Sequence, residues 1–233
     1  TSLCASYPGD KAKYDDDIVS KAIVRVLAEA TNLVDTQKEE LEEIGSKFAG
    51  LNENLDSVKN AQVEYDRLKQ VITDQEIAIE AAKGKTNKAE ALATLQAVQS
   101  TLEQNAGEIK KLSGKVNECL KHKEVNDNKW NDLKKAEDGR LTKLSKAIES
   151  ILTEYKDPAP DRVKEFTDLH KGLSTEYTDL CSEIEASYKA ETLIENWEDK
   201  TVEEETEKGF DSQISELEDS VDKALKDATD SDT

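Results

Sequence analysis

The sequence contains few of the residues that interrupt regular structure. Its 233 residues include 9 glycines, 3 prolines and no methionine, and aromatic side chains make up only 5%. Because glycine and proline are the strongest helix breakers, their scarcity beside 36% charged residues favours either long helices or disorder. Apolar residues make up another 36%, and their spacing decides between these two states.

Positive charge is also scarce. The chain carries 32 Lys and Arg against 52 Asp and Glu, a formal net charge of −20. Affinity for nucleic acid and for anionic membranes comes mostly from cationic side chains, so neither is an expected partner. No run approaches the length of a membrane-spanning helix. The opening "TSLCASYPGD" lacks an initiator methionine, which is typical of a processed chain. We therefore expect an extracellular or cell-surface location, with a cytosolic one as the alternative.

Apolar residues recur at alternating steps of four and three along most of the chain. The stretch 23–82 keeps this heptad phase for about sixty residues, which a helix can use and a strand, with its period of two, cannot. Gly45 and Gly50 lie within it and weaken the helix without shifting the phase. Three glutamines on the same seam are predicted to fix its register, namely Gln37, Gln62 and Gln75.

Two short segments interrupt the pattern. "KGKTNKAE" at 83–90 offers Gly84 as a helix end and Asn87 with Glu90 as a capping box. "DPAPD" at 157–161 places prolines where a helix interior does not accept them. The pattern slips again near 198–209, where Gly209 would allow a break. The predicted helices cover about 15–83, 87–156 and 161–229, the last one with this break.

Three helices of nearly equal length predict an all-α fold, an elongated up-down-up three-helix bundle of long coiled-coil-like helices. We expect an irregular N-terminal arm over 1–14, one elongated domain over 15–229 and a frayed acidic tail over 230–233. The alternative is two stacked bundles, which would need turns near 45–50 and near 120–128 together.

The stretch "VNECLKHKEVNDNKW" at 116–130 resembles a site, because a cysteine, a histidine and several acids lie close together. In the three-helix bundle His122 would lie level with about positions 49 and 195, and about 37 Å from His170. The two histidines could not share a metal, which needs three or four converging ligands. We predict no enzyme activity, no cofactor and no catalytic or metal-binding residue. The stretch is interpreted as a weak point or junction in the rod.

The cysteines and tryptophans of the chain are assigned to packing. Cys119 is interpreted as a core thiol, His122 as a solvated side chain, and Trp130 and Trp197 as core residues. Cys119 and Cys181 would lie about 25 Å apart, beyond the reach of a disulfide. Cys4 on the extended arm can reach Cys181, so Cys4–Cys181 is the predicted disulfide and Cys119 the free thiol. A free Cys119 or an exposed seam would allow a homodimer.

Taken with "KGKTNKAE", "DPAPD" and the three seams, the organisation resembles the elongated three-helix surface proteins of trypanosomes. These are the glutamic-acid/alanine-rich coat protein and the haptoglobin–haemoglobin receptor type, although alanine is not enriched here. The resemblance covers the whole chain as architecture. It implies display on a lipid anchor attached beyond Thr233 and a protein partner whose identity the sequence does not name.

Under this resemblance the end opposite the C-terminus would face outward and bind the partner. The candidate tip consists of Tyr7, Tyr14, Tyr155, Asp157, Pro158, Pro160 and Asp161. The predicted function is that of a non-enzymatic coat, adhesin or receptor. The alternatives are a secreted, for example salivary, protein that binds a host factor, and an intracellular coiled-coil scaffold. A membrane-bending scaffold needs a basic face, which the net charge of −20 disfavours.

Overall fold

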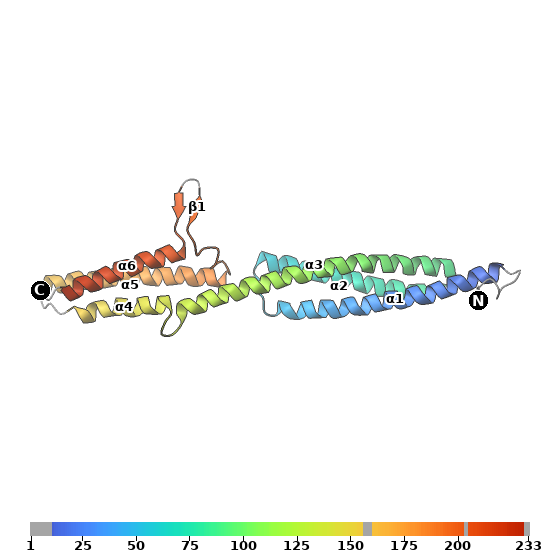
Figure 1. Ribbon diagram of the computed structural model, residues 1–233, viewed down its shortest axis with the longest axis horizontal. Coiled ribbons are helices and arrows are strands. Elements are labelled where there is room, and N and C mark those ends of the chain that lie inside the picture. Colours follow the sequence, from blue (N-terminus) through green and yellow to red (C-terminus); the bar gives the residue numbers. More distant parts are fainter. Residues whose placement is uncertain (1–10, 156–159, 203–204, 231–233) are drawn as a thin grey trace, which may run out of the picture. The chain divides into compact units, whose positions relative to one another are not determined.

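The chain folds almost entirely into helices, which confirms the predicted all-α class. The computed structural model describes residues 11–155, 160–202 and 205–230. In chain order these form α1 (Lys11–Phe48), α2 (Asp56–Lys83), α3 (Lys88–Lys134), α4 (Arg140–Glu154), α5 (Pro160–Lys189), β1 (Lys200–Val202), β2 (Glu205–Glu207) and α6 (Phe210–Asp230) (Figure 1). Within these residues no helix is both long and apolar enough to cross a membrane.

The chain divides into two compact units, Thr1–Leu120 and Lys121–Thr233, where the seams predicted one domain over 15–229. The boundary between the units falls inside α3. Two units and a turn after Phe48 agree with the alternative of two bundles, but its second turn near 120–128 is absent, because α3 is helical throughout that stretch. Each unit has its own hydrophobic core.

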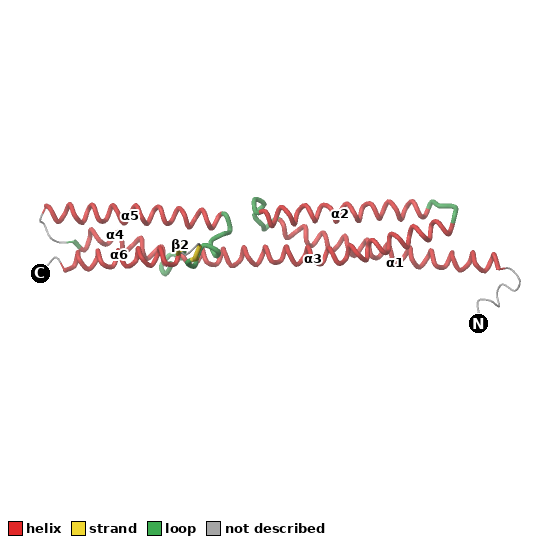
Figure 2. The backbone as a smooth tube through the Cα atoms, turned by 90° about the horizontal axis from the view of Figure 1, so that it is seen from above, coloured by secondary structure: helices red, strands yellow, loops and turns green. Residues whose placement is uncertain are grey.

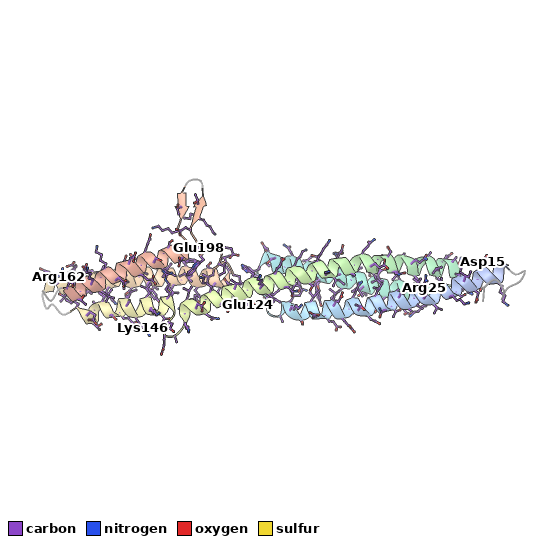
Figure 3. All side chains as sticks on the ribbon, viewed as in Figure 1. Asp15, Arg25, Glu124, Lys146, Arg162 and Glu198 are labelled. Carbon is purple, nitrogen blue, oxygen red and sulfur yellow. The ribbon has the colours of Figure 1, made fainter. Side chains whose placement is uncertain are left out.

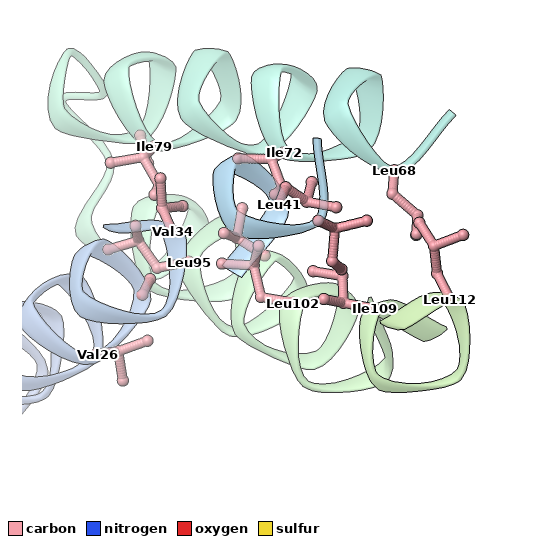
Figure 4. Close-up of a cluster of buried hydrophobic side chains, with 14 of the residues drawn as sticks. Val26, Val34, Leu41, Leu68, Ile72, Ile79, Leu95, Leu102, Ile109 and Leu112 are labelled. Atoms are coloured by element: carbon pink, nitrogen blue, oxygen red, sulfur yellow. The ribbon is translucent and has the colours of Figure 1, made fainter. Parts of the chain in front are cut away.

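In the first unit α1, α2 and the first part of α3 lie side by side (Figures 1 and 2). Their apolar stripes face inward, and Leu41, Ile72 and Leu102 converge from the three helices (Figure 4). A buried amide pair crosses this core, because Gln37 Nε2 donates to the Leu102 carbonyl at 2.6 Å and Asn105 Nδ2 donates to Gln37 Oε1 at 2.9 Å. Of the three seam glutamines, only Gln37 is buried.

The prediction of one helix over 15–83 is wrong. Helix α1 ends at Phe48 and α2 begins at Asp56, and the chain reverses between them (Figure 2). The turn contains Gly50 and two asparagines, and Asn52 Oδ1 accepts a hydrogen bond from the Asn54 backbone N–H at 3.1 Å. Leu51 nevertheless packs against the core from within the turn. The heptad phase therefore continues across a reversal that the pattern alone does not reveal.

The predicted boundary at 83–90 is confirmed, because α2 ends at Lys83 and α3 begins at Lys88. Asn87 caps α3, since its Oδ1 accepts from the backbone N–H groups of Ala89 at 3.0 Å and Glu90 at 3.2 Å. Its Nδ2 also donates to Glu90 Oε1 at 3.2 Å. The pairing predicted from the capping-box pattern is thus present, although Glu90 contacts the side chain of Asn87 and not its backbone.

In the second unit α4, α5 and α6 lie side by side around a core that includes Leu141, Phe166 and Ile214 (Figures 1 and 2). The expected helix over 87–156 is interrupted, because α3 ends at Lys134 and α4 begins at Arg140. Gly139 is the N-cap of α4, and a Cβ there would press against the backbone of Lys135 at 2.5 Å. Only glycine fits this close approach, which the seam pattern did not disclose.

The predicted break at "DPAPD" is confirmed by the helix bounds, since α4 ends at Glu154 and α5 begins at Pro160. The break expected near 198–209 is also confirmed, but it is longer and contains a β-hairpin that was not predicted. Strands β1 and β2 pair antiparallel, with Lys200 opposite Glu207, Thr201 opposite Thr206 and Val202 opposite Glu205. The hairpin stands away from the helices of its unit (Figure 1).

Candidate functional site

The segment 190–199, which we call the root segment, leads from α5 to the hairpin and packs against α3. Asn126 of α3 is fully buried and binds both the last turn of α5 and the root segment. Its Nδ2 donates to the Tyr188 carbonyl at 3.0 Å, and its Oδ1 accepts from the Leu193 backbone N–H at 3.2 Å. The stretch 116–130 was interpreted as a weak point or junction in the rod. The boundary between the two units does fall within it, after Leu120, but the helix is not interrupted there and Asn126 anchors the neighbouring segment.

Glu191 lies two residues after the last residue of α5, in an unusual conformation. Its φ is 55°, in the left-handed region that glycine usually occupies. The Glu191 N–H donates to the Tyr188 carbonyl at 3.0 Å and the Thr192 N–H to the Ser187 carbonyl at 2.9 Å. This is the hydrogen-bond pattern of a Schellman motif, in which the left-handed residue is most often glycine.

The Glu191 side chain faces a histidine. His122 Nε2 lies 2.7 Å from Glu195 Oε1, and His122 Nδ1 lies 3.9 Å from Glu191 Oε2. We call His122, Glu191 and Glu195 the acid–histidine cluster. Burial raises the pKa of Glu191, whereas Lys123 and His122 act to lower it. The neighbouring Lys123 is bound by Asp127 at 2.5 Å, a hydrogen bond that raises the pKa of Lys123.

Aromatic side chains pack beside this cluster. Trp130 stacks on Tyr188 with ring centroids 4.9 Å apart and an angle of 7° between the rings. Lys129 Nζ lies 3.7 Å from the ring centroid of Trp197. Both tryptophans are partly buried and packed against the second core, which agrees with their assignment to the core. Burial also raises the pKa of Tyr188.

The end of the hairpin is fixed to the start of α6. The Phe210 N–H donates to the Asn196 carbonyl at 2.9 Å, and the Gly209 N–H donates to Asp199 Oδ1 at 2.8 Å. Hydrogen bonds from Ser212 and then from the Gly209 N–H lower the pKa of Asp199. A Cβ on Gly209 would overlap the Trp197 carbonyl, so the chain needs glycine here. An open pocket of about 170 Å³ lies beside these residues.

One predicted neighbour of His122 is found in the structure. His122 was expected level with about position 195, and it contacts Glu195. Its assignment as a solvated side chain left out its partners, because the side chain is 38% exposed and its ring nitrogens lie 2.7 Å from Glu195 and 3.9 Å from Glu191. The sequence offered Glu191 and Glu195 no special pattern, and neither was singled out. Position 195 was expected level with His122, and asking which side chain stands there would have identified Glu195.

The candidate tip is divided between the two units. Tyr14 belongs to α1, while Pro160 and Asp161 start α5. Tyr155 is half-buried and stacks on Phe166 at 4.6 Å. Tyr7, Asp157 and Pro158 lie outside the described residues. The seven residues were predicted to share one end because the first helix was expected to be unbroken over 15–83. Since α1 ends at Phe48, this argument for a shared tip no longer holds.

The cysteines carry little further information. Cys119 is half-buried and not fully buried as expected, and Cys181 packs at the edge of the second core. Neither is in a disulfide within the described residues. Cys4 lies outside them, so the Cys4–Cys181 bond stays a prediction. Its geometric support weakens, because that reasoning also assumed the unbroken first helix.

No group of three His, Cys, Asp or Glu side chains that could hold a metal occurs among the described residues. A pocket of about 610 Å³ in the first unit is large enough for a small molecule, and Phe48, Val58 and Val63 contribute apolar lining. No histidine, cysteine or serine lines this pocket. The acid–histidine cluster and the hairpin beside it are therefore the most distinctive site in the described part of the chain.

No protein-family model matches the chain, and searches of curated proteins and of solved structures find no match. The resemblance to trypanosome surface proteins therefore stays a prediction that rests on architecture alone. Any functional assignment has to come from the hairpin, the root segment and the surface charge.

Proposed function

We propose that the protein is a non-enzymatic, secreted or surface-displayed helical-bundle protein that acts as a coat, adhesin or receptor through protein–protein contacts. We further propose that the β1–β2 hairpin, in place of the candidate tip, is the main contact element. One observation carries this proposal, namely an exposed hairpin held on a fixed base.

The hairpin side chains that the structure describes are exposed. These are Lys200, Thr201, Thr206 and Glu207, and none of the four belongs to the second core cluster. A two-stranded hairpin is marginally stable by itself, yet this one is held by the Asn196–Phe210 and Asp199–Gly209 hydrogen bonds. Elements that protrude from a rigid scaffold without packing on it are common binding elements.

Charge suggests the chemistry of the partner. The segment "EDKTVEEETEK" at 198–208 carries six acidic and two basic side chains, counted from the sequence. Glu198 lies at the base of the hairpin (Figure 3). A basic protein surface would complement this segment, and complementary charge mainly speeds association and gives specificity. We therefore expect binding to weaken as salt rises.

The test compares three variants, two of which remove the same number of negative charges. Glu205→Gln with Glu207→Gln removes two negative charges from the hairpin, and Glu39→Gln with Glu42→Gln removes two from exposed positions of α1. Asp161→Asn tests the former tip. Each full-length chain is immobilised and exposed to serum or epithelial extract, and the captured proteins are quantified by mass spectrometry at low and high salt.

A specific partner should be captured equally by the native chain, the α1 control and Asp161→Asn, and at least several-fold less by the hairpin variant. Loss with Asp161→Asn alone would return the contact to the tip. Equal capture by all four chains would contradict the hairpin as the contact element.

A further inference from the structure

The two basic side chains of the acidic segment 198–208 both bind groups outside the hairpin. Lys200, at the start of β1, donates its Nζ to Asn196 Oδ1 of the root segment at 3.1 Å. Lys208, which follows the last residue of β2, forms an ion pair with Glu216 of α6. Each strand of the hairpin is therefore connected at its base to a different element of the second unit.

Asn196, which accepts from the first of these lysines, is itself held by several contacts. Its Nδ2 donates to Ser187 Oγ at 3.0 Å and to Thr192 Oγ1 at 3.3 Å. Its backbone carbonyl accepts from the Phe210 N–H at 2.9 Å. Ser187 is buried in the last turn of α5. Because the amide donors of Asn196 bind these hydroxyl groups, its Oδ1 is fixed in position as the acceptor for Lys200.

Two acids of the same segment have no such contact. Glu198 and Glu207 are exposed, and neither is in an ion pair among the residues that the structure describes. Lys200 lies opposite Glu207 in the strand register, where opposite charges often pair, but its ammonium group binds Asn196. The lysines thus bind groups of their own unit, while these two carboxylates remain open to a partner.

We propose that Lys200 and Lys208 are positioning residues that fix the direction of the hairpin and leave its acidic side chains as the contact surface for a basic partner. We call the Lys200–Asn196 hydrogen bond and the Lys208–Glu216 ion pair the two struts. A two-stranded hairpin is only marginally stable, so contacts at its base decide how freely it moves. The consequence for binding rests on the proposed function, because it assumes that the hairpin is the contact element.

The struts and simple charge attraction predict opposite results for binding. A lysine beside acidic side chains repels a basic partner, so charge alone predicts that Lys200→Met or Lys208→Met binds the partner more tightly. A strut predicts weaker binding, because a released hairpin has to be ordered when the partner binds. Since Lys208 and Glu216 are 54% and 58% exposed, we expect a modest loss of affinity, about two- to fivefold for each strut.

The first measurement needs no partner. In the full-length chain labelled with ¹⁵N, the heteronuclear NOEs of the Thr201 and Thr206 amides report motion of the hairpin on the ps–ns timescale. These NOEs should fall in Lys200→Met and in Lys208→Met. Lys146→Met removes the same charge from an exposed position of α4 and should leave them unchanged.

Rescue variants separate a strut from a general loss of folding. Lys200→Arg keeps a donor that can reach Asn196, and Lys208→Glu combined with Glu216→Lys reverses the ion pair without changing the net charge. Both should restore the native NOEs of the hairpin. Denaturant unfolding followed by tryptophan fluorescence checks that the second unit is folded in every variant, because both tryptophans lie in it.

The second measurement repeats the capture from serum or epithelial extract with the immobilised methionine variants, at low salt where the ion pair is strongest. Reduced capture of the specific partner by both variants, with Lys146→Met unchanged, supports the struts, and increased capture overturns them. Unchanged NOEs in both methionine variants would also overturn the struts, while the hairpin could remain the contact element. Lower NOEs without a specific captured partner would support the struts and contradict the proposed function.

Discussion

The two units solve the same packing problem with different buried polar groups. In the first unit Gln37 and Asn105 are neutral amides, and their hydrogen bonds stay within the core. In the second unit Asn126 is an amide too, but next to it lies the buried carboxyl group of Glu191, facing His122. A buried amide pair fixes the register of helices at every pH. A buried carboxyl group makes the local stability depend on pH.

This contrast separates architecture from regulation. The first unit contains the polar contact expected of a helical bundle, where one buried amide specifies how the seams align. The second unit adds ionisable groups in and beside the segment between α5 and α6, from which the hairpin protrudes. The following changes test the contrast, beginning with the largest expected effect.

Asn126→Ala should destabilise the second unit most. It leaves the Leu193 N–H and the Tyr188 carbonyl without their buried side-chain partner, and we expect a loss of about 2–4 kcal/mol in the free energy of unfolding. Both tryptophans of the chain lie in this unit, so denaturant unfolding followed by tryptophan fluorescence measures it directly. Asn128→Ala, an exposed neighbour, is the matched control and should change stability by less than about 0.5 kcal/mol. A similar loss in both variants would show that the anchor is not specific.

Gln37→Leu should destabilise the first unit by about 1–2 kcal/mol, because Asn105 loses its buried acceptor. Replacing both Gln37 and Asn105 by leucine should be nearly neutral, since no buried polar group is then left without a partner. Helix content monitored by circular dichroism during denaturation measures both variants, and hydrogen exchange locates the change. If the double variant is less stable than the single one, the amide pair adds net stability to the fold and does more than supply each buried amide with a hydrogen-bond partner.

Much of the helical architecture could be predicted from the sequence. The heptad seams predicted the all-α class, and the Gly84–Asn87 and "DPAPD" signals predicted helix ends that the structure confirms. The reversal after Phe48 could not be found in this way, because Leu51 continues the apolar phase while it lies in a turn. The break at Gly139 is set by a backbone contact, for which hydrophobic periodicity gives no signal.

The candidate site was harder to predict than the fold. The stretch 116–130 resembles a site in the sequence, and helix lengths alone predict that His122 lies level with about position 195, where the structure has Glu195 in contact with it. Glu191 carries no sequence signature, because a glutamate in a left-handed C′ position resembles every other surface glutamate in the pattern. The stretch 116–130 was interpreted as a weak point or junction, and Asn126 within it was not singled out, since a polar residue in such a stretch indicates either a defect or a buried anchor. Only the backbone groups of Tyr188 and Leu193 distinguish the two.

Glu191→Gly should stabilise the second unit near pH 8 by about 0.5–1 kcal/mol. The substitution removes a side chain from a left-handed position and a carboxylate from a buried one. The gain should shrink as pH falls, because the raised pKa means that the native glutamate is increasingly neutral in mild acid. Tryptophan fluorescence at several pH values measures it. Glu195→Gly, at a residue without positive φ, is the control and should be destabilising.

The ion pair between Arg67 of α2 and Glu108 of α3 should have the smallest effect. Its atoms approach to 2.5 Å, but the two side chains are 51% and 45% exposed. Exposed pairs of this kind contribute about 0–1 kcal/mol, and added salt screens them further. A double-mutant cycle with Arg67→Ala and Glu108→Ala should give a coupling energy below about 0.5 kcal/mol that disappears in high salt. A larger, salt-resistant coupling would mean that surface charge contributes to register in the first unit, and the contrast with the second unit would then rest on burial of the acid alone.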